Sequence, residues 1–237
     1  MEFKIVHLYP ELLNHYGDLG NILSLKKRLE ERGISATVKT YSANDTPDFD
    51  DADIVYIGGG NDKAFMLAYK ALLSHKEALR KYVEADGVAL AVCNGFEMLG
   101  NSFVLGGETY EGFGILDITT KGSGSRIAGN IIVESSELGF NIVGFENHMG
   151  VVNSSGHTPL GTVLFGRGND NGSEGVIYKK LIGTYIHGPL LPKNPHLADH
   201  IIKNAMQKKY GECELSLLDD TLENNAHNYI IKKYLNK

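Results

Sequence analysis

The feature that most constrains the fold of this chain is a continuous apolar run that ends on a cysteine. Residues 88–92 read Val-Ala-Leu-Ala-Val, Cys93 follows directly, and Gly95 stands two positions later. A run without polar alternation is typical of a strand buried on both faces, as in parallel sheets covered by helices. Cys93 then falls at the carboxyl end of a strand, where open α/β sheets place their chemistry. At the turn into a following helix, the helix N-terminus would favour the nucleophilic thiolate.

Strand and helix patterns alternate through the first hundred residues and predict an open, mostly parallel α/β sheet with right-handed crossovers. The predicted strands are residues 3–9, 34–39, 53–57 and the run that ends at Cys93. One amphipathic helix is expected over residues 18–32, with Gly33 as its stop. A second is expected to run from a cap at Asn61 or Asp62 to about Glu84, with a break near residues 74–75.

The second half of the chain differs from the first in composition and in the pattern of its apolar residues. Residues 103–187 are rich in Gly, Thr, Ser, Val and Ile and predict short, partly antiparallel strands, at 129–134, 140–145, 162–165, 175–178 and 181–186. Helix patterns then return. Asn194 and Pro195 offer a cap and a first-turn proline, and a last helix repeats an apolar residue every four positions, at Leu222, Ala226, Ile230 and Tyr234. We therefore predict one α/β domain with a β-rich second half, and a helical extension over residues 196–237 packed on that domain.

Length and charge limit the classes of protein that this chain can belong to. The 237 residues suit one large α/β domain, and a net charge of −6 argues against nucleic-acid binding. No apolar segment approaches the roughly 20 residues that span a bilayer, and the N-terminus lacks the layout of a signal peptide. With two cysteines and no Cys-x-x-Cys pair, we expect a reducing, cytoplasmic setting and no metal site.

A cysteine nucleophile needs a base and donors for an oxyanion, and the sequence offers candidates for both. The backbone N–H of Asn94 follows the nucleophile. Gly59 or Gly60 can supply a second donor, because the triplet at 58–60 also ends a predicted strand. A triple glycine is equally consistent with a plain tight turn.

Among nine histidines, His187 is the strongest candidate base because it ends the strand pattern at 181–186. His148 holds a similar position in the stretch 145–150, and the remaining histidines are read as structural. Arg126, alone in the glycine- and serine-rich stretch 122–127, can clamp a carboxylate through two parallel hydrogen bonds or simply be a solvated loop residue. Cys213 is flanked by acids and is expected to be non-catalytic.

Taken together, these motifs resemble the class I (triad-type) glutamine amidotransferases, and most closely their cobyric-acid-synthase-like branch. The matching motifs are Gly58-Gly59-Gly60, Val92-Cys93-x-Gly95, Phe145-Glu-Asn-His148-Met-Gly150 and Thr184-Tyr-x-His187-Gly. The stretches 8–10, 16–21, 112–117, 143–148 and 183–189 are similar to the peptidoglycan-amidating members. The resemblance spans residues 5–195, taken as a glutamine amidotransferase domain, and implies a flavodoxin-like open sheet.

The resemblance implies a glutaminase that serves a carbon–nitrogen ligase. Cys93 would be the nucleophile, His187 the base and Arg126 the holder of L-glutamine, while Gly59, Gly60 and Asn94 would form the oxyanion hole. The ammonia would pass to a Mur-ligase-like (MurT-like) partner in a heterodimer, which amidates D-glutamate of lipid II to D-isoglutamine. ATP and magnesium are expected on that partner, because this chain has no phosphate-binding loop and is expected to hold no cofactor.

Two positions depart from the family pattern. His187 is followed by Gly188 and Pro189 rather than by an acid two residues on, so either a dyad suffices or another acid, with Glu146 one candidate, orients the histidine. Glu97 stands where the motif Cys-x-Gly-x-Gln has glutamine. A carboxylate there should raise the pKa of the Cys93 thiol unless it is paired or points away.

Two alternatives stay open at this point. A stand-alone cysteine hydrolase of γ-glutamyl substrates needs the same strand-end cysteine and histidine. A non-catalytic regulatory subunit that kept the fold would account for both departures.

Overall fold

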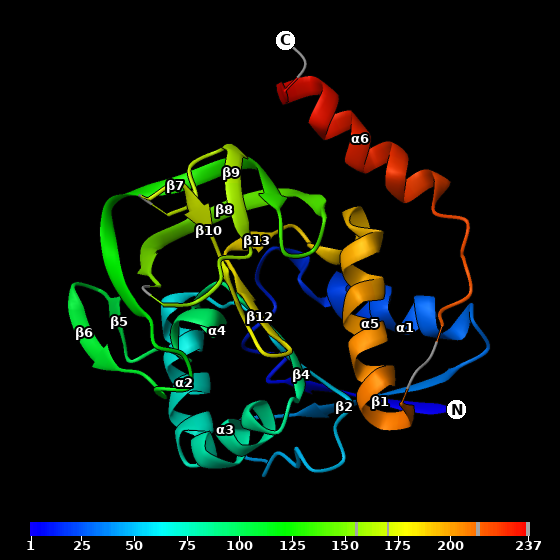
Figure 1. Cartoon of the computed structure of the whole chain (residues 1–237). Coiled ribbons are helices and arrows are strands. Elements are labelled where there is room, and N and C mark those ends of the chain that lie inside the picture. Colours follow the sequence, from blue (N-terminus) through cyan, green and yellow to red (C-terminus); the bar gives the residue numbers. More distant parts are fainter. Residues whose placement is uncertain (155, 170, 212–213, 236–237) are drawn as a thin grey trace.

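Two β-sheets organise the chain in the computed structural model, which describes residues 1–154, 156–169, 171–211 and 214–235 (Figure 1). The first has six strands in the order β11-β12-β4-β3-β1-β2. All its neighbouring strands are parallel except the pair β11 and β12. Its strands are β1 (Glu2–Leu8), β2 (Ser35–Tyr41), β3 (Ile54–Ile57), β4 (Val88–Val92), β11 (Val176–Tyr178) and β12 (Leu181–Thr184). The predicted open, mostly parallel sheet is confirmed.

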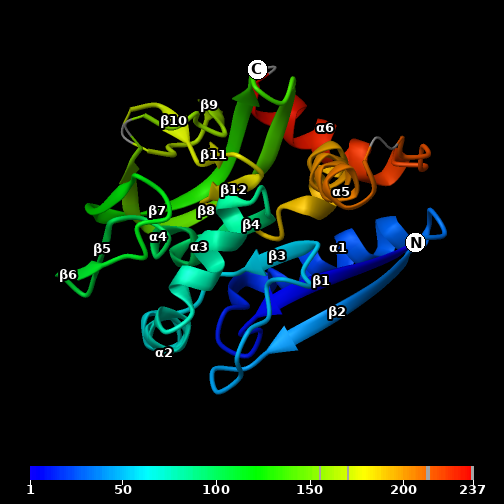
Figure 2. The same cartoon turned by 60° about the horizontal axis from the view of Figure 1, so that its bottom comes forward.

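Helices cover both faces of this sheet, which is why β3, β4 and β12 are buried along their whole length (Figure 2). α1 (Leu19–Glu30) and α5 (Pro195–Tyr210) pack on one face. α2 (Asp62–Leu73) and α3 (Lys76–Glu84) pack on the other. Side chains of one strand therefore alternate between two apolar layers.

The predicted helix boundaries in the first half are confirmed. Gly33 ends the first helical segment with φ of 71° and donates its N–H to Glu30 O. Asn61 caps α2, where its side chain accepts the backbone N–H of Ala64 at 3.1 Å. The expected break at residues 74–75 separates α2 from α3.

The second sheet is built on two long strands, and the expectation of uniformly short strands is wrong. β7 (Thr119–Ser135) has 17 residues and β8 (Phe140–Asn153) has 14. The glycine-rich stretch lies within β7, which pairs with β8 up to Gly122 and again from Ile127, with a register shift between these two residues. Arg126 consequently lies on β7 rather than in a loop. The smaller strands are β5 (Ser102–Leu105), β6 (Glu108–Glu111), β9 (Gly161–Phe165), β10 (Ser173–Glu174) and β13 (Ile186–His187).

One of the links between the two sheets lies beside the predicted site. β12 of the first sheet ends at Thr184, and β13 begins two residues later and pairs with β8. The predicted strand at 181–186 is thus two strands in different sheets. Because the chain changes sheet here, His187 lies at the seam between them.

The C-terminal helices follow the prediction in position but not in detail. Asn194 precedes α5 as expected, but its side chain does not cap the helix; it bonds the backbone of Val143 and Leu190. α6 (Thr221–Leu235) forms where predicted and projects beyond the sheets (Figure 1). Its apolar repeat is packed only in part: Leu222 is 80% exposed, whereas the ring of Tyr234 lies against Phe165, with ring centroids 4.4 Å apart. Among its described residues, α6 buries only His227. The domain boundary at residue 195 stays a prediction.

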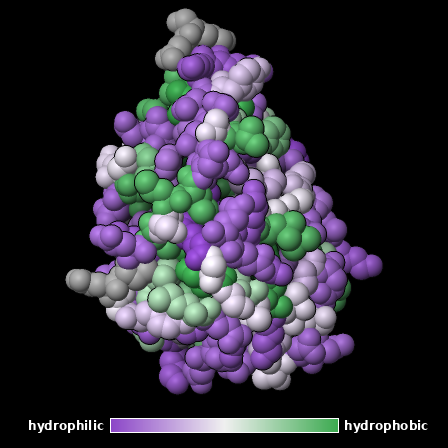
Figure 3. All heavy atoms as spheres, turned by 90° about the vertical axis from the view of Figure 1, so that its right-hand side faces the viewer, coloured by the Kyte–Doolittle hydropathy of each residue, from purple (hydrophilic) through white to green (hydrophobic). Residues whose placement is uncertain are grey.

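The face that carries α1, α5 and α6 is mostly hydrophilic at its surface, with apolar patches between the polar groups (Figure 3). Below it, the buried guanidinium of Arg28 on α1 forms paired bonds with Asp199 of α5 and with Asp220, the residue before α6. Arg32 adds a second bond to Asp199 at 2.8 Å. This cluster of charges connects three segments that are distant in the sequence. None of the helices in the described ranges is long and apolar enough to cross a membrane.

Replacing Arg28 with Met should lower the free energy of unfolding by about 3 kcal/mol, because Asp199 and Asp220 would lose a buried partner. Lys27→Met is the matched control, since Lys27 lies on the same helix with a 64% exposed side chain and surface ion pairs only. Urea denaturation of both variants measures the difference. Equal, small losses for the two variants would contradict this role for Arg28.

Candidate active site

Cys93 occupies a strained turn between β4 and α4 (Asn94–Glu97). Its backbone has φ of 57° and ψ of −129°, a conformation that L-residues rarely adopt. Its N–H donates to Thr184 O at 2.8 Å, which fixes the turn against the end of β12. Gly95 must be glycine, because a Cβ there would lie 2.3 Å from Gly58 O. A nucleophile on such a strand-to-helix elbow is held exposed at the sheet edge.

The glycine turn after β3 lies directly against this elbow. A Cβ on Gly59 would stand 2.8 Å from Cys93 Cβ and 3.4 Å from His187 Cε1. Only glycine lets the backbone come this close. The structure therefore brings together Gly59, Cys93 and His187, as the sequence predicted.

Asn94 ties the elbow to the same turn with its side chain. Gly60 N–H donates to Asn94 Oδ1 at 3.0 Å, and Asn94 Nδ2 donates to Gly60 O at 2.8 Å. The backbone N–H of Asn94 is directed at the Cys93 sulfur. The oxyanion roles of Gly59, Gly60 and Asn94 stay predictions, and Gly60 N–H would have to leave Asn94 to take part.

His187 has an acidic partner that the sequence reading missed. Its Nδ1 lies 3.0 Å from Asp18 Oδ2, and both side chains are fully buried. Within the described part of the chain, His187 Nε2 has no hydrogen-bond partner. The sequence places Asp18 at the start of a helix, although it belongs to the stretch 16–21 that carries part of the resemblance. Glu146, the acid considered instead, accepts N–H bonds from Arg167 and Gly168 and lies near His148.

Packing explains how Asp18 reaches His187. A Cβ on Gly20 would stand 2.4 Å from Pro189 Cγ, so the start of α1 approaches the segment after His187 closely. On the other side, buried Glu174 accepts the hydroxyl of Thr184 at 2.8 Å and the N–H of Tyr185 at 2.7 Å. These bonds hold the link between the two sheets and so orient His187.

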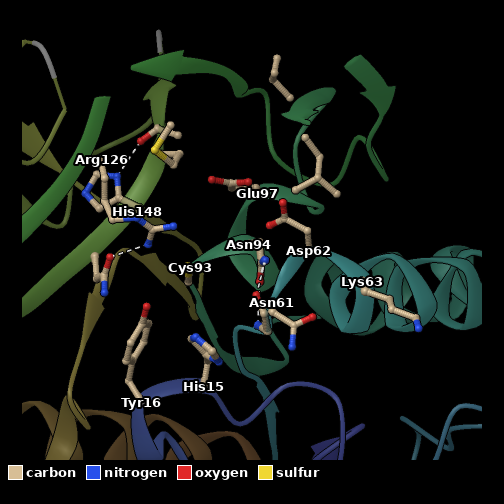
Figure 4. Close-up of a pocket in the computed structure, with 16 residues that line it drawn as sticks. His15, Tyr16, Asn61, Asp62, Lys63, Cys93, Asn94, Glu97, Arg126 and His148 are labelled. Carbon is tan, nitrogen blue, oxygen red and sulfur yellow. Dashed lines mark hydrogen bonds between the residues drawn. The ribbon is translucent and has the colours of Figure 1, made fainter. Parts of the chain in front are cut away.

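Cys93 opens into a pocket of about 410 Å³ whose lining includes Asp62, Glu97, Arg126 and His148 (Figure 4). Arg126 reaches it from β7, where its Nη1 donates to Asn147 Oδ1 at 2.7 Å. His148 bonds Gly150 O through Nδ1 and stacks on the Tyr185 ring, with ring centroids 4.0 Å apart. The pocket thus combines the thiol with a guanidinium and two carboxyl groups.

Comparison with known proteins agrees with this geometry. Residues 4–195 match the model of the CobB/CobQ-like glutamine amidotransferase domain. The chain belongs to that family.

Two curated relatives match almost the whole chain. The GatD subunit of the glutamine-hydrolysing lipid II isoglutaminyl synthase from Staphylococcus aureus (strain N315) is 38% identical over 98% of this chain and 96% of its own length. The GatD subunit from Streptococcus pneumoniae (strain ATCC BAA-255 / R6) is 38% identical over 93% of this chain and 87% of its own. The resemblance stated from the sequence is therefore confirmed.

The solved structures agree at the level of the fold. A glutamine amidotransferase from Thermotoga maritima superposes with a TM-score of 0.54 at 14% identity, covering 98% of this chain and 94% of its own. The predicted class I glutamine amidotransferase fold is confirmed.

The electrostatics of the pocket disfavour the thiolate when the pocket is empty. Burial raises the pKa of the Cys93 thiol well above its usual range, and the charge of Glu97 raises it further. Burial also raises the pKa of Glu97 to about 7, although the Tyr185 hydroxyl donates to Glu97 Oε1 at 2.7 Å. Glu97 is therefore paired with Tyr185, yet its charge still acts on the thiol. The sequence alone did not show whether Glu97 is paired or points away from Cys93.

The structure shows no metal site among the described residues, and it leaves the second cysteine untested. Among the residues that the structure describes, no group of three or more His, Cys, Asp or Glu side chains could hold a metal ion. Cys213 lies outside the described residues.

In the free protein, alkylation of Cys93 by iodoacetamide should be slow at pH 7 and rise about tenfold per pH unit into the alkaline range, because only the thiolate reacts. Peptide mass spectrometry across pH 6–10 measures the rate at Cys93 separately from Cys213. Cys93→Ala gives the background. A rate that levels off below pH 8 would show that the thiol is not suppressed.

Proposed function

We propose that this chain is the glutaminase subunit of a lipid II isoglutaminyl synthase in peptidoglycan synthesis. It hydrolyses L-glutamine to glutamate and supplies ammonia to a Mur-ligase-like (MurT-like) partner, which uses ATP to amidate D-glutamate of lipid II. The observation that carries the proposal is the alignment of Cys93, His187 and Asp18 behind a pocket that contains Arg126. The near full-length likeness to GatD subunits supports the choice of ligase.

In the first half of the reaction, His187 Nε2 takes the proton of the Cys93 thiol. The thiolate attacks the side-chain amide carbon of glutamine, and the N–H of Asn94 stabilises the oxyanion that forms. Asp18 accepts the Nδ1–H of His187, which keeps the ring in the tautomer that leaves Nε2 free to act as the base. The fixed, buried pair of Asp18 and His187 also stabilises the imidazolium.

In the second half, imidazolium His187 gives its proton to the leaving nitrogen, so that the carbon–nitrogen bond breaks and ammonia departs. A γ-glutamyl thioester on Cys93 remains. His187 then takes a proton from water, the hydroxide attacks the thioester, and glutamate and the free thiol are released. Each proton moves through Nε2, the nitrogen that has no hydrogen-bond partner among the described residues.

Arg126 is placed to hold the α-carboxylate of glutamine. Its bond to Asn147 fixes the guanidinium at the wall of the pocket that Cys93 lines. A planar guanidinium binds a carboxylate through two parallel hydrogen bonds. This contact would set the distance from the α-carbon to the thiol and so select the length of the substrate.

The ATP-dependent step is assigned to a second chain. The sequence has no phosphate-binding loop, and the relatives are named as subunits of a synthase. ATP and magnesium would be held by that partner, which we propose forms a heterodimer with this chain. Ammonia made at Cys93 would be consumed there.

Replacing Cys93 with Ala should abolish glutamate release from glutamine by the co-expressed pair. Amidation of lipid II with glutamine should be lost as well, while amidation with added ammonium chloride should persist, because only the ammonia supply is removed. Size-exclusion chromatography, glutamate release and mass spectrometry of lipid II measure the three properties.

Co-elution of the Cys93→Ala variant with the ligase subunit is the control for assembly. Normal glutamate release by this variant would exclude Cys93 as the nucleophile. Activity on γ-glutamyl peptides but not on free glutamine in the wild-type pair would favour the stand-alone hydrolase. Unchanged amidation with glutamine in the variant would favour a non-catalytic subunit.

Replacing Asp18 with Asn should lower kcat for glutamine between about 10²- and 10⁴-fold and change KM little, because Asp18 orients His187 without lining the pocket. Steady-state glutamate release measures both constants. Asp50→Asn, an exposed acid before β3, is the matched control and should leave kcat unchanged. A wild-type kcat in the Asp18 variant would mean that the dyad of Cys93 and His187 suffices.

A further inference from the structure

The mechanism above gives no part to several charged groups of the pocket, namely Glu97, Asp62 and Lys63. Glu97 projects into the pocket from the end of α4, while Arg126 reaches it from β7 (Figure 4). Glutamine carries two opposite charges on its α-carbon, a carboxylate and an ammonium. Arg126 accounts for the carboxylate, so the ammonium needs an acceptor in the same space.

Glu97 is a carboxyl group that its surroundings hold in place. It is 6% exposed, and the Tyr185 hydroxyl donates to its Oε1 at 2.7 Å. A Cβ on Gly150 would lie 2.2 Å from the same oxygen, so glycine at that position leaves the room the carboxyl occupies. Segments from α4, β8 and the link between the sheets therefore meet around this one group.

The charge of Glu97 is unfavourable for the nucleophile while the pocket is empty. It adds to the effect of burial in raising the pKa of the Cys93 thiol. The other groups that act on Glu97 are the Tyr185 hydroxyl and His148, which lower its pKa, and Asp62, which raises it. No lysine or arginine is hydrogen-bonded to it among the described residues, so a cationic ligand would offset a charge that the protein leaves partly unbalanced.

We propose that Glu97 binds the α-ammonium group of glutamine, and that this contact offsets the charge of the carboxyl group beside Cys93. The nucleophile would then become active only when a substrate with a free α-amino group is in place. This inference rests on the proposed glutaminase function and adds a specificity-determining residue to it. Arg126 and Glu97 together would recognise both charges of the amino acid.

If Glu97 binds the α-ammonium group, the protein should prefer glutamine to an analogue that lacks this group. Glutaramate has the side-chain amide and the carboxylate of glutamine but lacks the α-amino group. It should bind Arg126 and place its amide at Cys93, yet leave the Glu97 carboxyl without a cation to offset its charge. The wild-type protein should therefore prefer glutamine to glutaramate by about 100-fold or more in kcat/KM, since both binding and thiolate formation suffer.

Glu97→Gln tests this, because glutamine keeps the shape of the side chain and can still accept the Tyr185 hydroxyl. The variant, assayed with its partner subunit, should lose about tenfold in kcat/KM for glutamine, mainly through KM. Its activity on glutaramate should be kept or raised, so the preference should collapse. In the free protein, alkylation of Cys93 by iodoacetamide at pH 7 should become about tenfold faster.

Asp62→Asn is the matched control, since it removes a carboxylate from the same pocket at an exposed position in the first turn of α2. It should leave the preference between the two substrates unchanged. Tyr185→Phe, which removes the hydroxyl that positions Glu97, should raise KM for glutamine and not for glutaramate. Thermal melting of each variant checks the fold.

Equal losses on both substrates in Glu97→Gln, or an unchanged alkylation rate, would overturn the proposal. Collapse of the preference in Asp62→Asn would move the ammonium site to Asp62 and overturn it as well. If the wild-type pair released no glutamate from glutamine, the proposed function would fail. The alkylation rates, which need no turnover, would still decide whether Glu97 suppresses the thiol.

Discussion

The parallel register of β3, β4 and β12 determines where every reacting group of this protein lies. Ile57 pairs with Ala91, and Val92 pairs with Thr184, so the three strands end at one edge of the sheet. The glycine turn, the Cys93 elbow and the link that leads to His187 leave from that edge within contact of one another. A slip of one residue in this pairing would turn each strand's side chains to the opposite apolar layer, so the same packing that stabilises the core holds the site in register.

Burial at that edge has opposite effects on the groups it assembles. It strengthens the bond between Asp18 and His187, because both side chains are removed from water. It also disfavours ionisation of the Cys93 thiol and of the Glu97 carboxyl, which have no charged partner of opposite sign in hydrogen-bond contact among the described residues. Without substrate, little of the Cys93 thiol is ionised. The charges of a bound substrate then affect how readily the thiolate forms.

The strongest sequence predictions concerned local patterns with a physical cause. The apolar run at 88–92 could only be a doubly buried strand, and Gly33 and Asn61 marked helix ends through backbone conformation and capping. The failures came where pairing partners decide the outcome. The stretch 122–127 favoured a loop, but it lies within β7, which pairs with β8 up to Gly122 and again from Ile127, and this carries Arg126 to the pocket. The repeat in α6 matched a helix, yet nothing in the described structure covers its Leu222.

The parallel sheet and the position of Cys93 at a strand end follow from the sequence alone, because hydrophobic periodicity and turn residues act over short distances. Only the tertiary structure decided which acid serves His187. Asp18 is 169 residues away in the chain and reaches Nδ1 through the close packing of Gly20 against Pro189. The surroundings of Glu97 were decided in the same way, since Tyr185, in the link between the two sheets, and Gly150 of β8 both contact it. Contacts of this kind depend on how the layers of the fold pack, so they cannot be predicted from the spacing of residues along the chain.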